Sequence, residues 1–163
     1  MRLKTLLPLD KALVIIDEAL RLARQENMLP QTVIVLDAGG KIIAVKSEDG
    51  SGLVRFGIAM GKAWGALGMG ISSRLIAERL GNRPNFLTGV TSASEGRFIP
   101  VPGGVLIDDD DGYTIGAVGI SGDTSEKDEF CAIGGIQTAG FKSEPAEADP
   151  NWRGSNLSGT QTP

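Results

Sequence analysis

Glycines interrupt two apolar runs of this chain that otherwise have the composition of β-strands. The first run contains Pro102-Gly103-Gly104-Val105, and the second contains Gly116-Ala117-Val118-Gly119-Ile120-Ser121-Gly122. Glycine weakens a strand interior because it has no side chain to pack, so its presence there indicates a tight turn or the close approach of another group. Two candidates for that group are a bound ligand and a packed helix.

Length and charge narrow the class of protein. The 163 residues are enough for one domain with a substantial core, and the formal net charge is -4. The absence of a basic run argues against nucleic-acid binding. Charged residues break each apolar stretch short of a membrane span, and the N-terminal apolar stretch is too short for a signal peptide. We therefore expect a cytoplasmic protein, and the single cysteine, Cys131, fits a reducing compartment.

The chain has no histidine. This excludes a Ser-His-Asp or Cys-His catalytic arrangement, and it also excludes zinc or haem held by histidine. Any proton transfer must use aspartate, glutamate, lysine, tyrosine or cysteine side chains.

Hydrophobic periodicity predicts an α+β fold with the element order α-β-β-α-α-β-β-α. Two pairs of strands are each joined by a short turn, so we expect an antiparallel sheet with helices packed on it. Asp10, Ser72 and Thr124 are the expected helix N-caps. We expect residues 83–96 to be irregular. The expected helices are 9–27, 53–67, 72–80 and 124–140, and the expected strands are 32–36, 41–46, 101–107 and 113–120.

The composition changes near residue 143. We expect one α+β domain over residues 1–142 and a polar C-terminal tail, or an arm used in oligomerisation, over residues 143–163. Trp152 is the one aromatic side chain in that tail. An isolated aromatic of this kind is typical of an anchor in a partner's pocket, and we expect removal of the tail to loosen an assembly while the domain stays folded.

The order and spacing of several short motifs resemble the haem-degrading or haem-binding family that includes the glycolate-operon G protein and secreted haem-binding proteins. The resemblance covers residues 9–140 and implies a homo-oligomer based on dimers, such as an octamer. It implies haem as a cofactor, whereas the residues themselves lead us to expect none. The motifs are Val35-Leu36-Asp37-Ala38-Gly39-Gly40, Ile58-Ala59 with Lys62-Ala63, Pro102-Gly103-Gly104-Val105, Gly116–Gly122 and Asp128-Glu129.

Lys62 lies at the edge of the apolar stripe on the helix expected over residues 53–67. Gly57, Gly61 and Gly65 recur every fourth residue there, although each costs a helix about 0.8–1 kcal/mol relative to alanine. A functional interpretation makes Lys62 the cation that binds a carboxylate, or a desolvated catalytic amine. The alternative is helix packing with a lysine that extends its amine to solvent.

The loop before the third strand is a second candidate. Pro102, Gly103 and Gly104 are able to present backbone N–H groups to an anion, or they form a tight entry into the strand. Arg97, with Glu95 beside it, is either an anion contact or half of a solvated pair. The resemblance favours a ligand site in this loop.

Three further features involve acidic or sulfur-containing side chains. Asp128 and Glu129 begin the last helix, where they act as a general base near Lys62 or stabilise the helix dipole. Cys131 is interpreted as a buried small side chain. The run 108–111 lacks the pattern of a calcium loop and is interpreted as a solvated turn, so we expect no dedicated metal site.

Our main hypothesis is an oligomer that binds a small anionic metabolite near Lys62, Gly103, Gly104 and Glu129. The first alternative is a cofactor-independent lyase, isomerase or hydratase that acts on a small oxo- or hydroxy-acid. In it, Asp128 or Glu129 moves the proton and Lys62 stabilises the developing charge. The second alternative is haem binding, which the resemblance alone implies.

Overall fold

A five-stranded antiparallel sheet forms the centre of the molecule, in the strand order β2-β1-β4-β3-β5. The computed structural model describes residues 5–157. The α+β class and the hairpin-linked antiparallel sheet are confirmed. The strands are β1 Thr32–Asp37, β2 Ile42–Ser47, β3 Gly104–Asp108, β4 Thr114–Ser121 and β5 Lys142–Glu144. The helices are α1 Leu9–Gln25, α2 Arg55–Met69, α3 Ser73–Leu80, α4 Pro84–Ala93, α5 Ser125–Thr138 and the short 3₁₀ helix η1 Trp152–Gly154.

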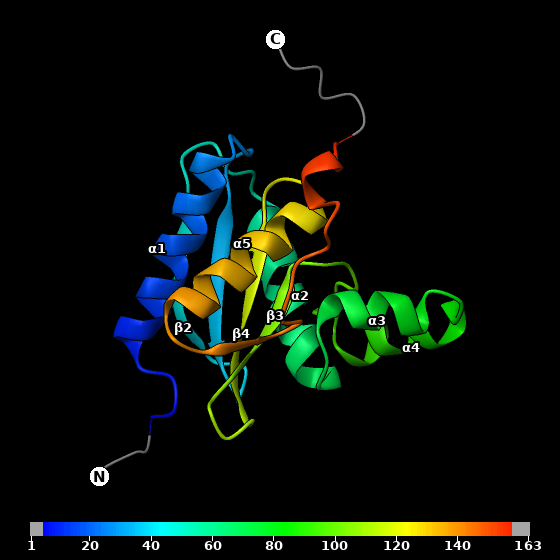
Figure 1. Cartoon of the computed structure of the whole chain (residues 1–163). Coiled ribbons are helices and arrows are strands. Elements are labelled where there is room, and N and C mark those ends of the chain that lie inside the picture. The colour runs from blue at the N-terminus through cyan, green and yellow to red at the C-terminus, as the bar shows by residue number, and fades with distance from the viewer. Residues whose placement is uncertain (1–4, 158–163) are drawn as a thin grey trace.

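Helices cover both faces of the sheet. Helices α1 and α5 pack side by side on one face, whereas α2 lies on the other face and α3 and α4 project beyond the sheet edge (Figure 1). Strand β1 shows how alternation produces these layers: Val33 and Val35 contribute to the α1–α5 core, and Ile34 and Leu36 contribute to the α2 core. The sheet is therefore buried on both faces.

Helix α2 approaches two of the glycines in the strands, whereas Gly116 lies against Leu36 of β1 and Leu7. A Cβ atom on Gly119 would lie 2.0 Å from the carbonyl oxygen of Ala59, and one on Gly104 would lie 2.3 Å from the carbonyl oxygen of Lys62. Of the two candidates, the packed helix therefore explains these two positions. The glycines of α2 differ in their surroundings. Gly61 faces the side chain of Ile99, whereas a Cβ on Gly57 would meet nothing within 4 Å.

Several boundaries differ from the sequence-based expectation. Residues 83–96, expected to be irregular, contain the helix α4, in which Pro84 occupies the first turn where its missing N–H costs nothing. Asp10 is not the N-cap of α1, because the helix begins one residue earlier with Pro8 as N-cap. Ser72 does cap α3, and its Oγ accepts from Leu75 N at 3.4 Å. Thr124 occupies the N-cap position of α5 without a side-chain hydrogen bond to the helix.

The C-terminal strap, defined here as residues 142–157, lies against its own chain along α5 (Figure 1). It begins with β5, which pairs with β3. Trp152 is buried and stacks on Phe130 with 3.9 Å between ring centroids, and Arg153 forms an ion pair with Glu26. The expected tail thus packs on the domain over its described part, while residues 158–163 lie outside the described residues.

Three sequence interpretations concern the acidic run 108–111, metal sites and membrane spans. The run 108–111 forms the β3–β4 turn, where the carboxylate of Asp109 accepts from the Tyr113 N–H at 2.8 Å. Between residues 5 and 157, no group of three or more acidic, cysteine or histidine side chains is arranged to hold a metal ion. Over the same residues, no helix combines the length and apolarity that a membrane span requires.

Candidate functional site

A buried ion pair joins the middle of α2 to the start of α5. Lys62 Nζ donates to Asp128 Oδ2 at 2.9 Å and to the carbonyl oxygen of Ile120 at 2.9 Å. Both charged side chains are almost fully buried, with 2% and 1% of their surface exposed. Removing two charges from water costs several kcal/mol per ion (order of magnitude) before their attraction is counted. Burying this pair therefore costs the domain a large amount of desolvation free energy.

The glycine loop closes over this ion pair. Gly103 has a φ of +111°, and a Cβ there would lie 2.9 Å from Lys62 Nζ and 3.1 Å from the Cβ of Asp128. Gly104 N donates to Ser73 Oγ at 2.7 Å, so that amide is already bonded. Pro102, half-buried, precedes them. The loop lies against Lys62, as the sequence suggested. It packs closely over the ion pair, and its Gly104 amide donates to Ser73 and not to an anion.

Arg55 is a functional candidate that the sequence analysis missed. It begins α2, is only half-buried, and its Nη1 donates to Ser121 Oγ at 3.2 Å. Burial raises the pKa of Asp128, and the charge of Arg55 is one of the influences that oppose this rise. Arg55 and Lys62 are the only charged residues in α2, and their seven-residue separation places them on one face. That spacing was the signal available in the sequence.

Burial and nearby amides set the charge of the acidic groups around Lys62. Burial raises the pKa of Asp128, and Lys62 and the Asp123 N–H at 3.1 Å oppose this rise without cancelling it. Asp123 behaves oppositely: burial acts to raise its pKa, but hydrogen bonds from the N–H groups of Leu29 and Thr124 lower it overall. We call Arg55, Lys62, Ser121 and Asp128 the α2–α5 polar cluster.

Glu129 does not join this cluster. Its carboxylate is fully buried, its nearest described cation is Arg74 on α3, and the Arg74 Nε to Glu129 Oε1 distance is 3.5 Å. Neither oxygen has a hydrogen-bond partner. Burial raises the pKa of Glu129 to about 7. Consecutive helix residues point about 100° apart, so Asp128 faces Lys62 and Glu129 faces α3 and the strap.

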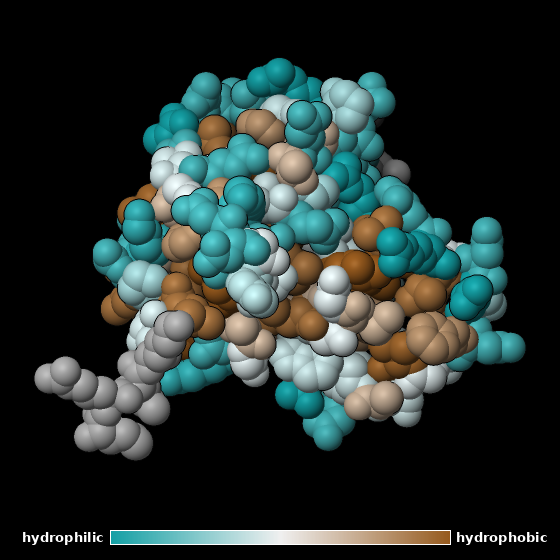
Figure 2. Space-filling model, turned by 60° about the horizontal axis from the view of Figure 1, so that its bottom comes forward, coloured by the Kyte–Doolittle hydropathy of each residue, from teal (hydrophilic) through white to brown (hydrophobic). Residues whose placement is uncertain are grey.

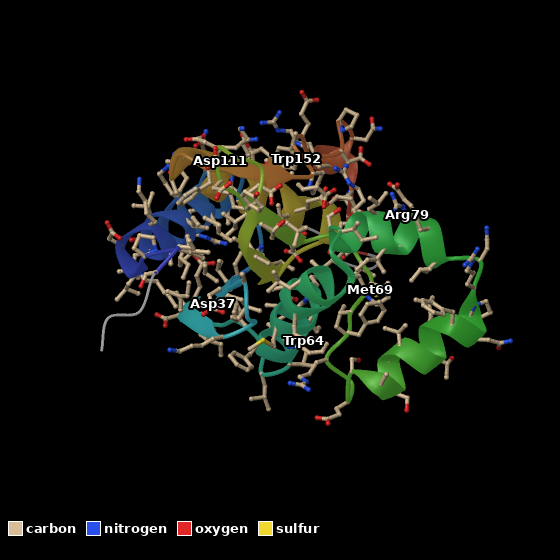
Figure 3. The ribbon with its side chains drawn as sticks, turned by 90° about the horizontal axis from the view of Figure 1, so that it is seen from below. Asp37, Trp64, Met69, Arg79, Asp111 and Trp152 are labelled. Carbon is tan, nitrogen blue, oxygen red and sulfur yellow. The ribbon has the colours of Figure 1, made fainter. Side chains whose placement is uncertain are left out.

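Arg97 also lies apart from the polar cluster. Its guanidinium stacks over the Trp64 ring at 4.6 Å, and its Nη2 lies 3.3 Å from a carboxylate oxygen of the exposed Glu95. Trp64 and Met69 point from α2 toward α4, as Figure 3 shows. The space between the two helices is an apolar groove of about 200 Å³, the α2–α4 groove, lined by Trp64, Gly65, Gly68, Met69, Val90, Ala93, Ser94 and Phe98. Figure 2 shows hydrophobic side chains gathered over this face of the molecule.

Cys131 is buried between the helices and the sheet, as expected. Burial raises the pKa of its thiol, and the thiol lies 3.6 Å from the sulfur of Met28. A thiol that stays protonated is a poor nucleophile, so Cys131 contributes packing and no reactive group.

The fold and the polar cluster define a small α+β domain whose two helical layers are joined by a buried ion pair near the C-terminal end of the central strand β4. Comparison with known proteins places it more narrowly: the chain belongs to the family described as haem degrading protein HbpS-like, whose model matches residues 7–137. This confirms the resemblance inferred from the motifs. No curated protein matches the sequence.

Solved structures share the fold. A structure described as a PduOC:heme complex has a TM-score of 0.74 at 26% identity and covers 83% of this chain and 96% of its own. The Klebsiella pneumoniae protein ORFY has a TM-score of 0.75 at 24% identity, with 85% and 94% covered. A double mutant of Streptomyces reticuli HbpS has a TM-score of 0.72 at 23% identity, with 86% and 91% covered.

Proposed function

We propose that this protein binds a small anionic metabolite, and that the α2–α5 polar cluster holds the anion. The observation that carries the proposal is the convergence of Arg55 and Lys62 on one buried carboxylate, Asp128. Lys62 and Asp128 balance each other, which leaves the half-exposed Arg55 guanidinium to pair with a ligand. Its fork of donors suits a carboxylate.

The charge balance of the cluster favours a monoanion. Asp123 lies beside Asp128 and pairs with Lys127, whose Nζ lies 3.2 Å from Asp123 Oδ1. One positive charge, that of Arg55, therefore remains uncompensated among these five side chains. A second carboxylate on the ligand would face Asp123 and Asp128 without a cation of its own, and like charges at close range repel.

A thermal-shift titration with paired small acids tests this proposal. We expect simple 2-oxo and 2-hydroxy monocarboxylates to raise Tm, and their dicarboxylate analogues to raise it less, because only binding to the folded state stabilises it. Arg55→Gln should remove the shift. Arg97→Gln is the matched control, since Arg97 is exposed and lies outside the cluster. Equal shifts in wild type and Arg55→Gln would place anion binding elsewhere.

We also propose that the protein acts as an oligomer. Three hydrophobic side chains at the start of α2 are strongly exposed, namely Leu53 (101%), Val54 (65%) and Phe56 (45%). They flank Arg55 in the sequence, so a neighbouring subunit seated on them would lie beside the half-exposed Arg55. Exposed apolar side chains gathered beside a polar site are typical of association surfaces.

Catalysis remains an alternative use of the same cluster. Asp128, with its pKa raised by burial, would accept a proton from a bound oxo- or hydroxy-acid, and Arg55 would stabilise the negative charge that develops. The acids that raise Tm are incubated with wild type and with Asp128→Asn, and their consumption is measured. This measurement distinguishes an enzyme from a binding protein. Loss of turnover with retained binding in Asp128→Asn is the result that supports catalysis.

Haem binding is the second candidate, favoured by the PduOC:heme complex at 26% identity. The α2–α4 groove fits haem poorly. The α2–α4 groove, with Met69 on its wall and Arg97 at its rim, has a volume of about 200 Å³, below the roughly 300–1,000 Å³ of typical ligand pockets. Three other candidate iron ligands lie outside the groove: Lys62 is bonded to Asp128, Cys131 is buried, and Tyr113 is exposed on the surface.

Haem titration tests this second candidate. We expect no stoichiometric, sharp low-spin Soret band at micromolar protein, because histidine is absent and methionine alone is a weak ligand. Met69→Leu serves as the control for any weak spectrum. A sharp stoichiometric band in wild type that disappears in Met69→Leu would instead assign haem to the α2–α4 groove.

A further inference from the structure

Glu129 lies beneath the C-terminal strap with no hydrogen bond to either carboxylate oxygen. The groups that face it come from three elements and the loop after β5. Arg74 of α3 is the one cation among them, with its Nε 3.5 Å from Oε1, and three carboxylates also act on Glu129. Those carboxylates belong to Glu126 of α5, Glu144 of β5 and Asp149 of the strap.

The strap is attached above Glu129 through contacts with α3 and α5. Arg74 Nη2 donates to the carbonyl oxygen of Glu147 at 2.8 Å, and the Glu144 carboxylate accepts from Ser72 Oγ at 3.1 Å. On α5, Gln137 Nε2 donates to the carbonyl oxygen of Ala146 at 2.8 Å. These contacts are polar and mostly lie at the surface. Opening the part of the strap that follows β5 would bring water to Glu129 and expose the buried Trp152, while strands β1 to β4 stay paired.

We propose that Glu129 is a pH-sensitive latch: its protonated form holds the C-terminal strap on α3 and α5, and its ionisation favours release of the strap. A charged Glu129 in the closed arrangement has no hydrogen-bond donor and lies among three other carboxylates. In the open arrangement it is hydrated, so ionisation shifts the equilibrium toward opening. This regulation is independent of anion binding at the polar cluster.

The direction of the pH effect follows from burial. Burial raises the pKa of Glu129 to about 7 in the closed state, against about 4.5 for a hydrated glutamate. Between these two values the closed state binds more protons than the open state. Closing is therefore strongest below about pH 4.5, weakens as the pH rises, and levels off above about pH 7. The opening constant rises at most about tenfold per pH unit across that window.

Hydrogen exchange on the full chain measures the opening directly. Amide exchange in residues 142–157 is followed from pH 5 to pH 8, corrected for intrinsic rates, and compared with β1 in the same samples. We expect wild-type strap opening to increase by about 40-fold between pH 5 and pH 7, with β1 much less affected. An equal increase in β1 would show global unfolding and would overturn the proposal.

Two variants assign the effect to Glu129. Glu129→Gln keeps the size of the side chain without its charge, so its strap opening should be independent of pH across this window. Glu147→Gln, an exposed carboxylate on the same strap, is the matched control and should behave as wild type. A pH response unchanged in Glu129→Gln, or lost equally in Glu147→Gln, would contradict the latch.

Arg74→Gln keeps the proposal testable should Glu129→Gln fail to fold. Arg74 also anchors the strap through Glu147, so strap opening should increase at every pH in this variant. Because Arg74 lowers the pKa of Glu129, the pH at which strap opening levels off should move upward. A transition at the wild-type pH in this variant would overturn the assignment.

Discussion

Lys62 illustrates how far single residues could be interpreted from the sequence. Its position at the edge of an apolar, glycine-rich helix face identified it, and Asp128 was named as a general base near it. The sequence did not show that the two side chains are almost fully buried. It also could not separate Asp128 from Glu129, because the direction of each depends on how α5 is rotated against its neighbours.

The buried ion pair changes the expected behaviour of a Lys62 variant. A lysine whose amine reached solvent would tolerate replacement by methionine, which keeps the aliphatic stem and removes the charge. Because this substitution leaves the buried Asp128 carboxylate without its cation, we now expect a loss of about 3–5 kcal/mol in the free energy of unfolding. Urea denaturation measures it.

The double variant Lys62→Met with Asp128→Asn is the control for this loss. It removes both charges and keeps an acceptor for the Asp123 N–H, so it should recover much of the lost stability. A single variant as stable as wild type would mean that the pair contributes no net stability, and binding measurements on Lys62→Met would then be directly interpretable.

At the scale of elements, close approach of α2 to the sheet explains most of the glycine pattern. The strand glycines were recognised as positions of close approach, but two candidates remained because a missing side chain does not identify its neighbour. Helix α4 was missed for another reason: Pro84, Gly89 and β-branched residues weaken helix propensity, and none of its residues is buried. Only Leu87 and Val90 pack against a core cluster, so the hydrophobic periodicity of α4 is weak.

Alanine substitutions should separate the two kinds of glycine. In Gly119→Ala the new Cβ would meet the Ala59 carbonyl oxygen at 2.0 Å, so α2 must move and we expect a loss of about 2 kcal/mol or more. Gly57→Ala adds a Cβ in open space on α2, and helix propensity should raise the free energy of unfolding by about 0.5–1 kcal/mol. Thermal or urea unfolding compares the two variants, and equal effects would show that the helix does not approach the sheet as described.

At the scale of the whole molecule, the predicted antiparallel sheet is confirmed, whereas the packing of the C-terminal strap was missed. Strap residues are polar, and their contacts with α3, α5 and β3 are formed across large separations in the sequence. Composition alone cannot reveal such contacts. Trp152 is buried on Phe130 of its own chain. Truncation at residue 142 should therefore lower the stability of the domain, in addition to any effect that it has on assembly.

Assembly should instead depend on the exposed start of α2. We expect the paired substitution Leu53→Ser and Phe56→Ser to reduce the mass of the assembly in sedimentation or light scattering, since both side chains are strongly exposed in the single chain. Because neither contributes to the core, circular dichroism and Tm of the dissociated form should show a folded domain. Phe86→Ser, which removes an exposed phenylalanine from α4, is the matched control. An unchanged mass in the α2 variant, with a smaller mass in Phe86→Ser, would move the subunit interface to the α3–α4 side of the molecule.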